Sequence, residues 1–519
     1  MRISYIPSSP RAWGTGAPKD ALGEMMKRPG LIAVFLMGFL PAATVSAYVL
    51  NSGNRWSDNP YVIDVITGPF QSHFGLDATR TMHMARSGLQ AWLNVGVGFS
   101  TNLAFYNTTS SASDIEIEAK TCCDGDCTSG CLGRATNVPF SDNCALDIYK
   151  NTNSPQSYSD DRTGTWDIQS ILSHEFGHCL GLGHPSNPEE AIMKQGQYAF
   201  AAYPKRFPRV DDKTGGQHAQ FIADYPIRVR ERTGGAWTQV AKTSGSVGVA
   251  TRADGWSLVA YETDPTRDTT SNVAHLAISA TGGVSPECIN WDEWTYDGVA
   301  VSEDTSGGFA KAFLAANDGG QILVYRNIYP ALLGCITGTR TLTTMSSRRR
   351  PSLAYDAGTA RLVMAFIDRD RGLLRLSTSD SSGAWTTPTQ LNTEWTDAPV
   401  GIDCGYWAPA GANRCFMAFP SADGTHLLRI AEGYINASGN YVHVGTSVAG
   451  GWTLNVAPDL QIINGNRLEI IHGSTDNTRN AYMYVRDCSS GCTDSTYPLD
   501  QRTYVGGGIS STKLVTAAP

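Results

Sequence analysis

The chain has 519 residues, of which 53 are glycine, 25 are proline and 12 are cysteine, and charged residues make up only 17%. Single hydrophobic cores stop growing near about 250–300 residues, so the length argues against one domain. An apolar fraction of 41% is enough for packed cores and excludes wholesale disorder. The net charge of -8 gives no basic surface for nucleic acid, and the cysteine content indicates an oxidising compartment.

The N-terminal segment indicates the same compartment. Residues 31–40 read LIAVFLMGFL, Lys27 and Arg28 precede them, and the small residues Val45-Ser46-Ala47 follow. This order is typical of a secretory signal peptide, which we expect to span residues 1–47. The apolar run is short for a membrane span, although a retained anchor is the alternative. We therefore expect a secreted, extracellular protein without a membrane span after signal removal.

Residues 48–225 mix strand-like and helix-like patterns, which predicts an α+β domain. Asp77 is a suitable N-cap for the first long helix, and alternating Ile115 and Ile117 are typical of a half-buried strand. In chain order, we expect a strand at 61–65, a helix at 77–94, a strand at 114–118, a cysteine-rich loop at 121–144, a long helix at 166–180 and a short one at 217–222.

Residues 174–184 read HEFGHCLGLGH and carry the strongest chemical signal in the chain. His174 and His178 are four residues apart, which puts both imidazoles on one face of a helix. Gly181 allows the helix to stop and the chain to turn, which brings in His184 as a third ligand. Three protein nitrogens leave one position open for water, as a catalytic zinc requires.

Glu175 follows the first histidine directly, within reach of a zinc-bound water. Zinc lowers the pKa of that water, and Glu175 is then the base that takes its proton during attack on a peptide carbonyl. The sequence therefore predicts a zinc metalloendopeptidase with Glu175 as catalytic residue and one catalytic Zn²⁺. A structural zinc or an inactive relative is the alternative, although all three ligands and the glutamate are intact.

Further residues around this motif carry a family resemblance. They are Arg55-Trp56, Trp166-Asp167-Ile168-Gln169, Phe176, Ala191-Ile192-Met193, and Asp211-Asp212 with Gly215 and Gln217. With the zinc motif, they make residues 48–225 resemble the metzincin peptidases, and most closely the matrixin-like branch. The resemblance implies a twisted, mostly parallel five-stranded sheet with two long helices. It also implies a Met-turn with Met193 beneath the zinc ligands, and extended protein or peptide substrates that pair with an edge strand.

The chain departs from that family in several places. Pro185 follows His184, where matrixins usually have serine, and no tyrosine directly follows the Met-turn, so Tyr198 is only a weak candidate for stabilising an oxyanion. No histidine lies between His83 and His174, so the second, structural zinc of animal matrixins is not expected. Calcium is a second candidate ion, from the family and from the acidic turn at 123–126, although a simple polar loop is the favoured interpretation of that turn.

From about residue 227 the helical patterns end. A sequence repeat, which consists of an alternating strand, a turn and an apolar strand, recurs roughly every fifty residues. The copies of this repeat begin at Val247, Val299, Leu353, Val400 and Leu460. This period predicts an all-β domain at 226–519, a five- or six-bladed β-propeller. Residues 227–230 are similar to a third strand and 508–510 to a first strand, which would make the sixth blade a split one. Two β-sandwiches with coincidental periodicity are the alternative.

Two features of the repeat region bear on its role. Residues 378–385 resemble the Asp-box turn of sialidase-like propellers, in which the tryptophan packs between strands. Arg348-Arg349-Arg350 is a candidate anion site, but an exposed basic turn is the favoured interpretation. A glycan or a protein is the candidate ligand of this domain. The alternative function is therefore a carbohydrate- or cell-surface-binding protein whose peptidase domain is secondary or inactive.

The cysteines divide evenly, six before residue 226 and six after it, so all of them can pair within their own region. In the repeat region we expect Cys404–Cys415, Cys488–Cys492 and Cys288–Cys335. The pairing in the first region stays open, and a zinc cluster at 122–131 is the rival to disulfides there. Cys179 lies about 100° around the helix from His178, so we expect it to face away from the metal and anchor the helix.

Overall fold

The computed structural model describes residues 49–50, 61–93, 103–107, 113–122, 131–137, 143–150, 158–159, 166–184 and 193, and then 225–517. Gaps in the last range lie at 244–245, 264–271, 296–297, 316–320, 330–337, 348, 369–372, 397, 422–426, 453–457, 474–480 and 500–505. The expected signal peptide, Arg55-Trp56 and the helix at 217–222 lie outside the described residues. No helix within these ranges is long and apolar enough to cross a membrane.

The first domain is built on a five-stranded sheet in the order β3-β2-β4-β6-β5. Its strands are β2 (Tyr61–Ile66), β3 (Leu103–Tyr106), β4 (Ile115–Lys120), β5 (Gly133–Asn137) and β6 (Cys144–Tyr149). The β2–β3, β2–β4 and β4–β6 pairs are parallel, and only β5 runs antiparallel to its neighbour β6. The expected mostly parallel sheet is therefore confirmed, as is the alternation in β4, where Ile115 and Ile117 are buried.

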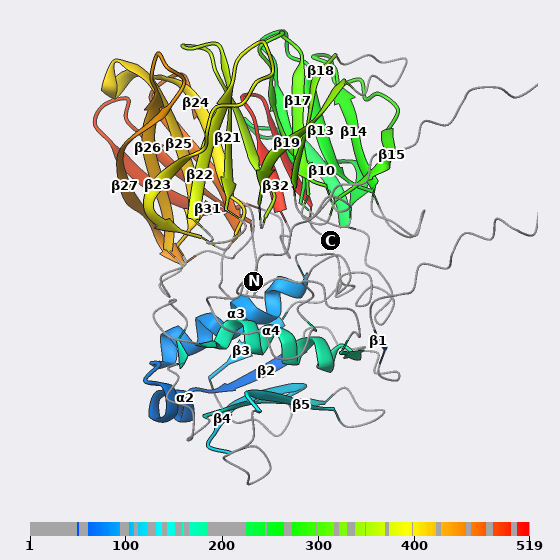
Figure 1. Ribbon diagram of the computed structural model, residues 1–519, viewed down its shortest axis with the longest axis vertical. Helices are drawn as coiled ribbons and strands as arrows, with labels where there is room; N and C mark the ends of the chain where they lie inside the picture. Colours follow the sequence, from blue (N-terminus) through cyan, green and yellow to red (C-terminus); the bar gives the residue numbers. More distant parts are fainter. Residues whose placement is uncertain are drawn as a thin grey trace, which may run out of the picture. The chain divides into compact units, whose positions relative to one another are not determined.

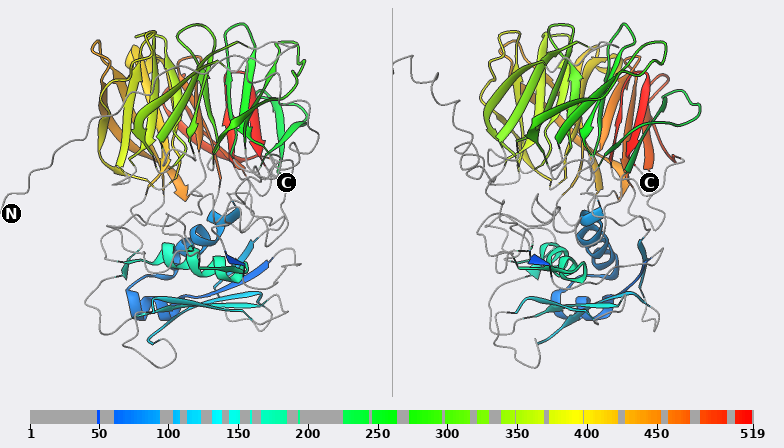
Figure 2. Two further views of the ribbon diagram at one scale, coloured as in Figure 1. Left: turned by 45° about the vertical axis from the view of Figure 1, so that its right-hand side comes forward. Right: turned by 90° about the vertical axis from the view of Figure 1, so that its right-hand side faces the viewer.

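In the described part of this domain, the helices are α2 (Thr67–Phe74), α3 (Ala78–Leu93) and α4 (Ile168–Cys179). Helix α3 begins where expected, because Oδ1 of Asp77 accepts the Arg80 backbone N–H at 2.8 Å and so caps the first turn. Helices α3 and α4 lie on the same face of the sheet (Figure 2). They are joined at two points: Nε1 of Trp92 donates to the Ser173 carbonyl at 2.7 Å, and Oγ of Ser173 donates to the Gly88 carbonyl at 2.6 Å.

Two sequence expectations for this domain need correction. The region 121–144 is not loop throughout, since it contains strand β5, whose Gly-Arg-Ala-Thr-Asn sequence lacks an apolar alternation. Its pairing with β6 through main-chain groups makes it a strand. Helix α4 begins at Ile168 rather than at Trp166, because Trp166–Asp167 form strand β8 and pair with β7 (Tyr158–Ser159).

Six four-stranded sheets make up the described part of the second domain. Each is a meander of antiparallel strands, and the sheets stand side by side like the blades of a propeller (Figure 1). The innermost strands of successive blades contact one another in a closed ring, β12-β16-β20-β24-β28-β32 and back to β12. A six-bladed β-propeller is therefore confirmed, and the five-bladed and sandwich alternatives are excluded.

The blades follow chain order. The first three are β12 (Gly248–Thr251), β13 (Ser257–Glu262), β14 (Asn272–Ile278), β15 (Cys288–Trp294); β16 (Ala300–Glu303), β17 (Phe309–Leu314), β18 (Gln321–Ile328), β19 (Thr339–Ser346); and β20 (Ser352–Asp356), β21 (Arg361–Ile367), β22 (Leu373–Ser379), β23 (Thr389–Trp395). The next two are β24 (Gly401–Trp407), β25 (Ala412–Pro420), β26 (Leu427–Ile435), β27 (Tyr441–Trp452); and β28 (Asp459–Ile463), β29 (Arg467–Gly473), β30 (Ala481–Asp487), β31 (Thr493–Pro498).

The sixth blade combines both ends of the region, as the sequence predicts. Its order is β32 (Gly506–Ile509), β33 (Lys513–Ala517), β10 (Tyr225–Glu231) and β11 (Thr238–Thr243). Strand β33 pairs antiparallel with β10, with Val515 opposite Val229. Strands from the two ends of the domain thus hydrogen-bond directly, which closes the ring without an exposed sheet edge between them.

Packing between blades explains why the second strands are apolar along their whole length. All six residues of β13 and of β17 are buried, because each of these strands is covered by a neighbouring blade on both faces. The Asp-box-like turn behaves as expected, since Trp385 bridges to Ser379 and packs against the hydrophobic cluster that includes Leu353 and Met364. The turn is thus a structural feature that marks the propeller fold.

The basic run at 348–350 differs from the expectation. Arg349 and Arg350 are only 7% and 3% exposed, so an exposed basic turn is wrong for these two residues; Arg348 lies outside the described residues. Nη1 of Arg350 donates to the carbonyls of Val247 and Val299, at 3.3 and 3.2 Å. These carbonyls immediately precede the innermost strands of the first two blades, and Arg350 satisfies them where no further strand is available.

Within the blades, one disulfide joins the neighbouring strands β24 and β25, and another closes the turn between β30 and β31. Cys404 pairs with Cys415 and Cys488 pairs with Cys492, which confirms both local predictions. Cys288 is disulfide-bonded, but Cys335 lies outside the described residues, so the Cys288–Cys335 pair stays a prediction.

Lys311 on β17 is fully buried between the first two blades. Its Nζ donates to Oδ1 of Asn290 at 2.5 Å and lies 3.2 Å from Nδ1 of His275. Burial lowers the pKa of Lys311 to about 7, far below its value of about 10.4 in an unfolded chain. At a pH between these two pKa values, Lys311 is protonated in the unfolded chain and neutral in the folded protein. The energetic penalty of burying this lysine is therefore fully present below pH 7 and is relieved as the pH rises towards 10.

Replacing Lys311 by Met should remove this pH dependence. We expect the free energy of unfolding of the wild type, relative to Lys311→Met, to rise by about 1 kcal/mol per pH unit between about pH 7 and 10. Urea denaturation of both proteins at several pH values measures this difference. Lys242→Met, at an exposed lysine on β11, is the control and should give a much smaller change of this difference with pH than Lys311→Met. An equally small change for Lys311→Met would contradict the prediction.

Candidate metal centre

Helix α4 and the turn after it bring three histidines to one point. His174 and His178 project from the same face of the helix, and Gly181, with φ of +90°, turns the chain so that His184 returns towards them. The three Nε2 atoms are each 3.1 Å from one another. A left-handed φ at Gly181 suits glycine, which explains why this residue type ends the helix. The three expected ligands are therefore brought together.

The spacing fits a tetrahedral zinc ion. Metal–nitrogen bonds of about 2.0–2.1 Å place neighbouring ligand nitrogens about 3.3 Å apart, close to the separation found. Among the described residues, this trio is the group of three or more His, Cys, Asp or Glu whose ligand atoms converge closely enough to hold a metal. Such a set of imidazole nitrogens is chemically suited to zinc.

The protonation of the histidines also fits metal binding. Nδ1 of His178 lies 2.7 Å from the carbonyl oxygen of Leu182, to which it donates, so its Nε2 is left with a free lone pair towards the centre. Burial lowers the pKa of His178 to about 4 and also lowers the pKa of His184. The imidazoles of His178 and His184 are therefore neutral at neutral pH, and a metal does not have to displace protons from these two side chains.

Glu175 lies beside this centre, only 5% exposed. Burial raises the pKa of its carboxyl to about 8, while a hydrogen bond from the backbone N–H of Ala135 opposes that rise. Ala135 belongs to β5, the strand at one end of the sheet, and this strand passes close to the glutamate. A Cβ atom at Gly133 would lie 2.8 Å from Oε1 of Glu175, so a glycine at this position makes room for the carboxyl group.

Met193 packs against the helix that carries the ligands. A Cβ atom at Gly177 would collide with Sδ of Met193 and would lie 2.7 Å from Cζ2 of Trp92. Met193 itself is 2% exposed and belongs to the core of the first domain. The contact places Met193 next to the residue that precedes His178, in keeping with the expected Met-turn.

The sequence alone did not single out Gly133, Ala135 and Gly177 as parts of the site. Ala135 acts through its backbone N–H, which leaves no trace in residue type. The two glycines matter because they leave space for neighbouring side chains. The one sequence signal for this role was Gly177, the small residue inside the zinc motif.

The C-terminal end of α4 is held by a disulfide between Cys179 and Cys144, the first residue of β6. Cys179 is fully buried in the core, so the expectation that it anchors the helix rather than binds the metal is confirmed. Cys122 and Cys131 are also disulfide-bonded, which contradicts the rival zinc cluster at 122–131. Their partners, and the positions of Cys123 and Cys127, lie outside the described residues.

Removing the Cys144–Cys179 bond by a Cys144→Ser and Cys179→Ser double substitution should destabilise the first domain. The bond closes a loop with a sequence separation of 35 residues, which corresponds to a stabilisation of about 3–4 kcal/mol. We also expect weaker zinc retention, because the bond fixes the end of α4 one residue after His178. Denaturant unfolding and a chelator competition titration measure the two effects. The Cys488→Ser and Cys492→Ser double variant is the control; equal zinc retention in both double variants would contradict the second expectation.

Several expected site residues lie outside the described residues. They are Pro185, Tyr198, the candidate wall of the specificity pocket at 194–210, the helix start at 211–217, and the acidic turn at 123–126 that suggested calcium. Calcium therefore has no support from the described part of the chain.

Comparisons with known proteins agree with this geometry. Residues 65–218 match the family model for matrixin. No curated protein matches the chain.

Solved structures give distant likenesses. The chain is similar to a protein of unknown function from Dyadobacter fermentans, with 12% identity, a TM-score of 0.34 and coverage of 53% of this chain and 94% of that one. It is also similar to the BP39L lectin from Burkholderia pseudomallei, with 9% identity, a TM-score of 0.35 and coverage of 51% and 74%. A functionally unknown protein from Desulfotomaculum acetoxidans has 11% identity, a TM-score of 0.34 and coverage of 57% and 83%.

The sheet, the histidine trio and the family match thus identify a matrixin-like domain at residues 65–218, which this chain combines with a six-bladed β-propeller.

Proposed function

We propose that this protein is a secreted zinc-dependent endopeptidase. The observation that carries the proposal is the convergence of the Nε2 atoms of His174, His178 and His184, each 3.1 Å from the others, beside the buried Glu175. Those three nitrogens are the proposed zinc ligands, and Glu175 is the proposed catalytic residue. When bound there, zinc would supply the Lewis acidity that polarises a peptide carbonyl and acidifies a water.

The chain's own residues have separate tasks in this proposal. A zinc ion bound beside Glu175 would counter the rise in the pKa of its carboxyl that burial causes. As a carboxylate, Glu175 then takes the proton of the attacking water and delivers one to the leaving amine. The Ala135 N–H holds that carboxylate in place from β5, and the Leu182 carbonyl fixes the tautomer of His178. Met193 packs against Gly177, the residue before His178, and so supports the helix that carries two of the proposed ligands.

Proteins or peptides are the proposed substrates. Strand β5 stands at the end of the sheet order and has β6 as its only neighbour in the described sheet. An extended peptide can add to such an edge through main-chain hydrogen bonds. Because β5 also contacts Glu175, a peptide paired with it would lie close to the proposed base.

The domain limits and the compartment belong to the same proposal. We place the peptidase domain at 48–225 and the repeat domain at 226–519, after a signal peptide at 1–47 that is removed on secretion. Three disulfides among the described residues are in keeping with an extracellular protein. Strand β10 (Tyr225–Glu231) begins one residue before the proposed start of the repeat domain, which supports a junction close to this point.

Digestion of a random peptide library with and without a zinc chelator tests the proposal. We expect cleavage of internal peptide bonds that the chelator abolishes and that added Zn²⁺ restores. The same data would give the residue preference on either side of the cut. Absence of chelator-sensitive cleavage by the zinc-loaded protein would count against the enzyme.

A carbohydrate- or cell-surface-binding protein with a secondary or inactive peptidase domain is the second candidate. The observation that favours it is a pocket in the propeller with several polar side chains. The two candidates differ in what Glu175→Ala does: the first predicts loss of the protein's biological activity, and the second predicts that it is unchanged.

A further inference from the structure

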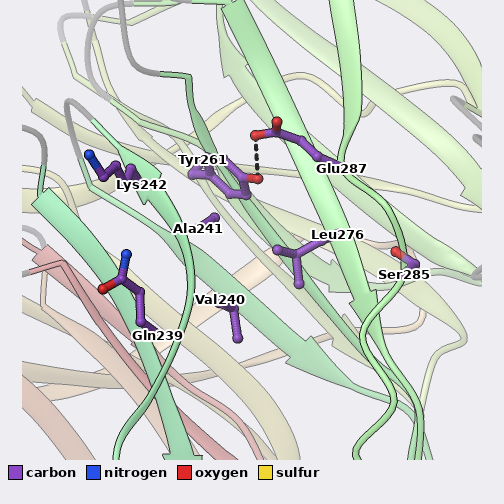
Figure 3. A pocket seen from close by; sticks show the side chains of 8 residues that line it. All are labelled: Gln239, Val240, Ala241, Lys242, Tyr261, Leu276, Ser285 and Glu287. Carbon is purple, nitrogen blue, oxygen red and sulfur yellow. Dashed lines mark hydrogen bonds between the residues drawn. The ribbon is translucent and has the colours of Figure 1, made fainter.

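The two faces of the sixth blade meet different neighbours. Val229 of β10 packs against the first blade, on the side where a pocket of about 460 Å³ lies between the two blades (Figure 3). Arg230 is the next residue along the strand, so its side chain points to the opposite face, which meets the fifth blade. Leu514, opposite Arg230 on β33, belongs to one hydrophobic cluster with Ile471 and Met483 of the fifth blade. Arg230 therefore stands at the junction of the fifth and sixth blades.

Trp237, just before β11, holds the Arg230 side chain in place. The Cζ atom of Arg230 lies over the indole ring, 4.5 Å from its centroid, and Trp237 packs on the hydrophobic cluster of this junction. A guanidinium over an indole is attracted to the ring face, and the N–H groups at its edge remain available for hydrogen bonds. Nε of Arg230 is buried and has no acceptor in the described part of the chain, while the residue as a whole is partly exposed. An anion from solvent can therefore reach a guanidinium that is fixed in position and has unused donors.

The charges around Arg230 do not neutralise it. Oε1 of Glu469 forms ion pairs with two other arginines, at 3.1 Å from Nη1 of Arg232 and 2.8 Å from Nε of Arg467. Nη1 of Arg467 also lies 3.9 Å from Oδ2 of Asp487. Among the described residues, these two carboxylates thus face three guanidinium groups, and none of the ion pairs includes Arg230. We call Arg230, Arg232 and Arg467 the arginine cluster. Its uncompensated positive charge favours an anion.

Tyr497 on β31 adds a hydroxyl donor beside the arginine cluster. Tyr497 is 43% exposed, and all three arginines are close enough to act on its hydroxyl electrostatically. Burial raises the pKa of this hydroxyl and the charge of Glu469 raises it further, while the arginines oppose the rise. The phenol is therefore protonated at neutral pH and can donate a hydrogen bond. The accessible groups of Arg230 and Tyr497 are thus donors, which selects for a ligand that accepts.

We propose that the arginine cluster between the fifth and sixth blades binds an oxyanion, the carboxylate or sulfate group of a small ligand, with Arg230 and Tyr497 as the residues that bind it. A guanidinium and a carboxylate can form two parallel charge-assisted hydrogen bonds. A neutral ligand would leave the positive charge of Arg230 uncompensated, and a cation would be repelled by it. The site lies wholly within the propeller, so the proposal goes beyond the peptidase chemistry and does not depend on it.

NMR titration of the full-length protein in an amine chloride buffer of low ionic strength tests this site. The signal is the indole N–H of Trp237, which a Trp237→Phe variant identifies. The probes share one ring and differ in charge: glucuronate and glucose 6-sulfate are anionic, glucose is neutral and glucosamine is cationic. We expect both anionic sugars to shift the signal with a Kd of about 10 mM or tighter, and glucose and glucosamine to bind at least about tenfold more weakly. Inorganic sulfate and acetate should compete with glucuronate, because the oxyanion is the group that is bound.

Arg230→Gln should weaken glucuronate binding about tenfold or more, because it removes the uncompensated charge, and Tyr497→Phe should weaken it several-fold. Arg414→Gln is the matched control. Cζ of Arg414 also lies over an aromatic ring, 5.5 Å from the centroid of Tyr434, but its Nε is 3.0 Å from Oε1 of Glu432. Since that arginine already has a carboxylate partner, its loss should leave the affinity for glucuronate unchanged.

Thermal unfolding of each variant shows whether the propeller stays folded. Three results would overturn the proposal. In the wild type, they are anionic sugars that bind no more tightly than glucose, or a failure of sulfate and acetate to compete. In folded variants, it is a glucuronate affinity that Arg230→Gln and Tyr497→Phe change no more than Arg414→Gln does. None of these results bears on peptide cleavage, so the proposed endopeptidase stands or falls separately.

Discussion

Glu175→Ala should reduce kcat/KM for peptide cleavage by about a thousandfold or more while the protein keeps its zinc. The expected loss follows from the size of general acid–base catalysis, about 10²–10⁴, to which the same carboxyl contributes in two proton transfers. Zinc should stay because the three imidazoles are the ligands and Glu175 is not among them. Quenched-fluorescent peptide assays and metal analysis of the purified variant measure both quantities.

Glu116→Ala is the matched control, since it removes a carboxylate of the same type from β4 in the middle of the sheet. It should leave both cleavage and zinc content unchanged. If Glu175→Ala retained more than about a tenth of the activity, a different base would have to be sought. If it lost its zinc, the loss of cleavage would report on metal binding rather than on proton transfer.

Val515→Asp should destabilise the propeller by about 3–5 kcal/mol, since it places an unpaired carboxylate in a dry core. Val515 is fully buried on β33, opposite Val229 of β10, and it belongs to the cluster that also holds Val247 and Tyr261 of the first blade. The substitution therefore weakens two contacts at once: the pairing that closes the sixth blade, and the packing of that blade on the first. Denaturant unfolding followed by tryptophan fluorescence measures the loss.

Val448→Asp is the control for the same chemical change, because Val448 on β27 is 48% exposed. It should change the free energy of unfolding by less than about 0.5 kcal/mol. Equal stability of the two variants would mean that closure through β33 contributes little to the propeller.

Much of the fold could be predicted from the sequence because it depends on short-range interactions. Asp77 offers a side-chain oxygen where the first long helix needs one, and the structure has that cap. Ile115 and Ile117 alternate because β4 buries one face more deeply than the other. The propeller repeat could be recognised because each blade needs an apolar second strand, which leaves a periodic signal, although five and six blades both stayed possible.

The sequence predictions that proved wrong concern residues whose structure depends on contacts with distant parts of the chain. Strand β5 was missed because it is made by main-chain pairing with β6, and its own residues carry no alternation. Arg349 and Arg350 were assigned to the surface because a run of three charges usually is solvated. Arg350 is buried because unpaired carbonyls at Val247 and Val299, far away in the sequence, need a donor.

The sequence by itself determined which histidines share the candidate site and the period of the propeller repeat, while it left five and six blades open. Histidines four apart on a helix must share a face, and a glycine after them allows the turn that recruits a third, so residue type and spacing suffice. Only the tertiary structure decided what surrounds them: the Ala135 N–H on Glu175, Met193 against Gly177, and the Cys144–Cys179 bond. The pocket between the sixth and first blades belongs to the same class, because it exists only once strands from the two ends of the propeller have closed the ring.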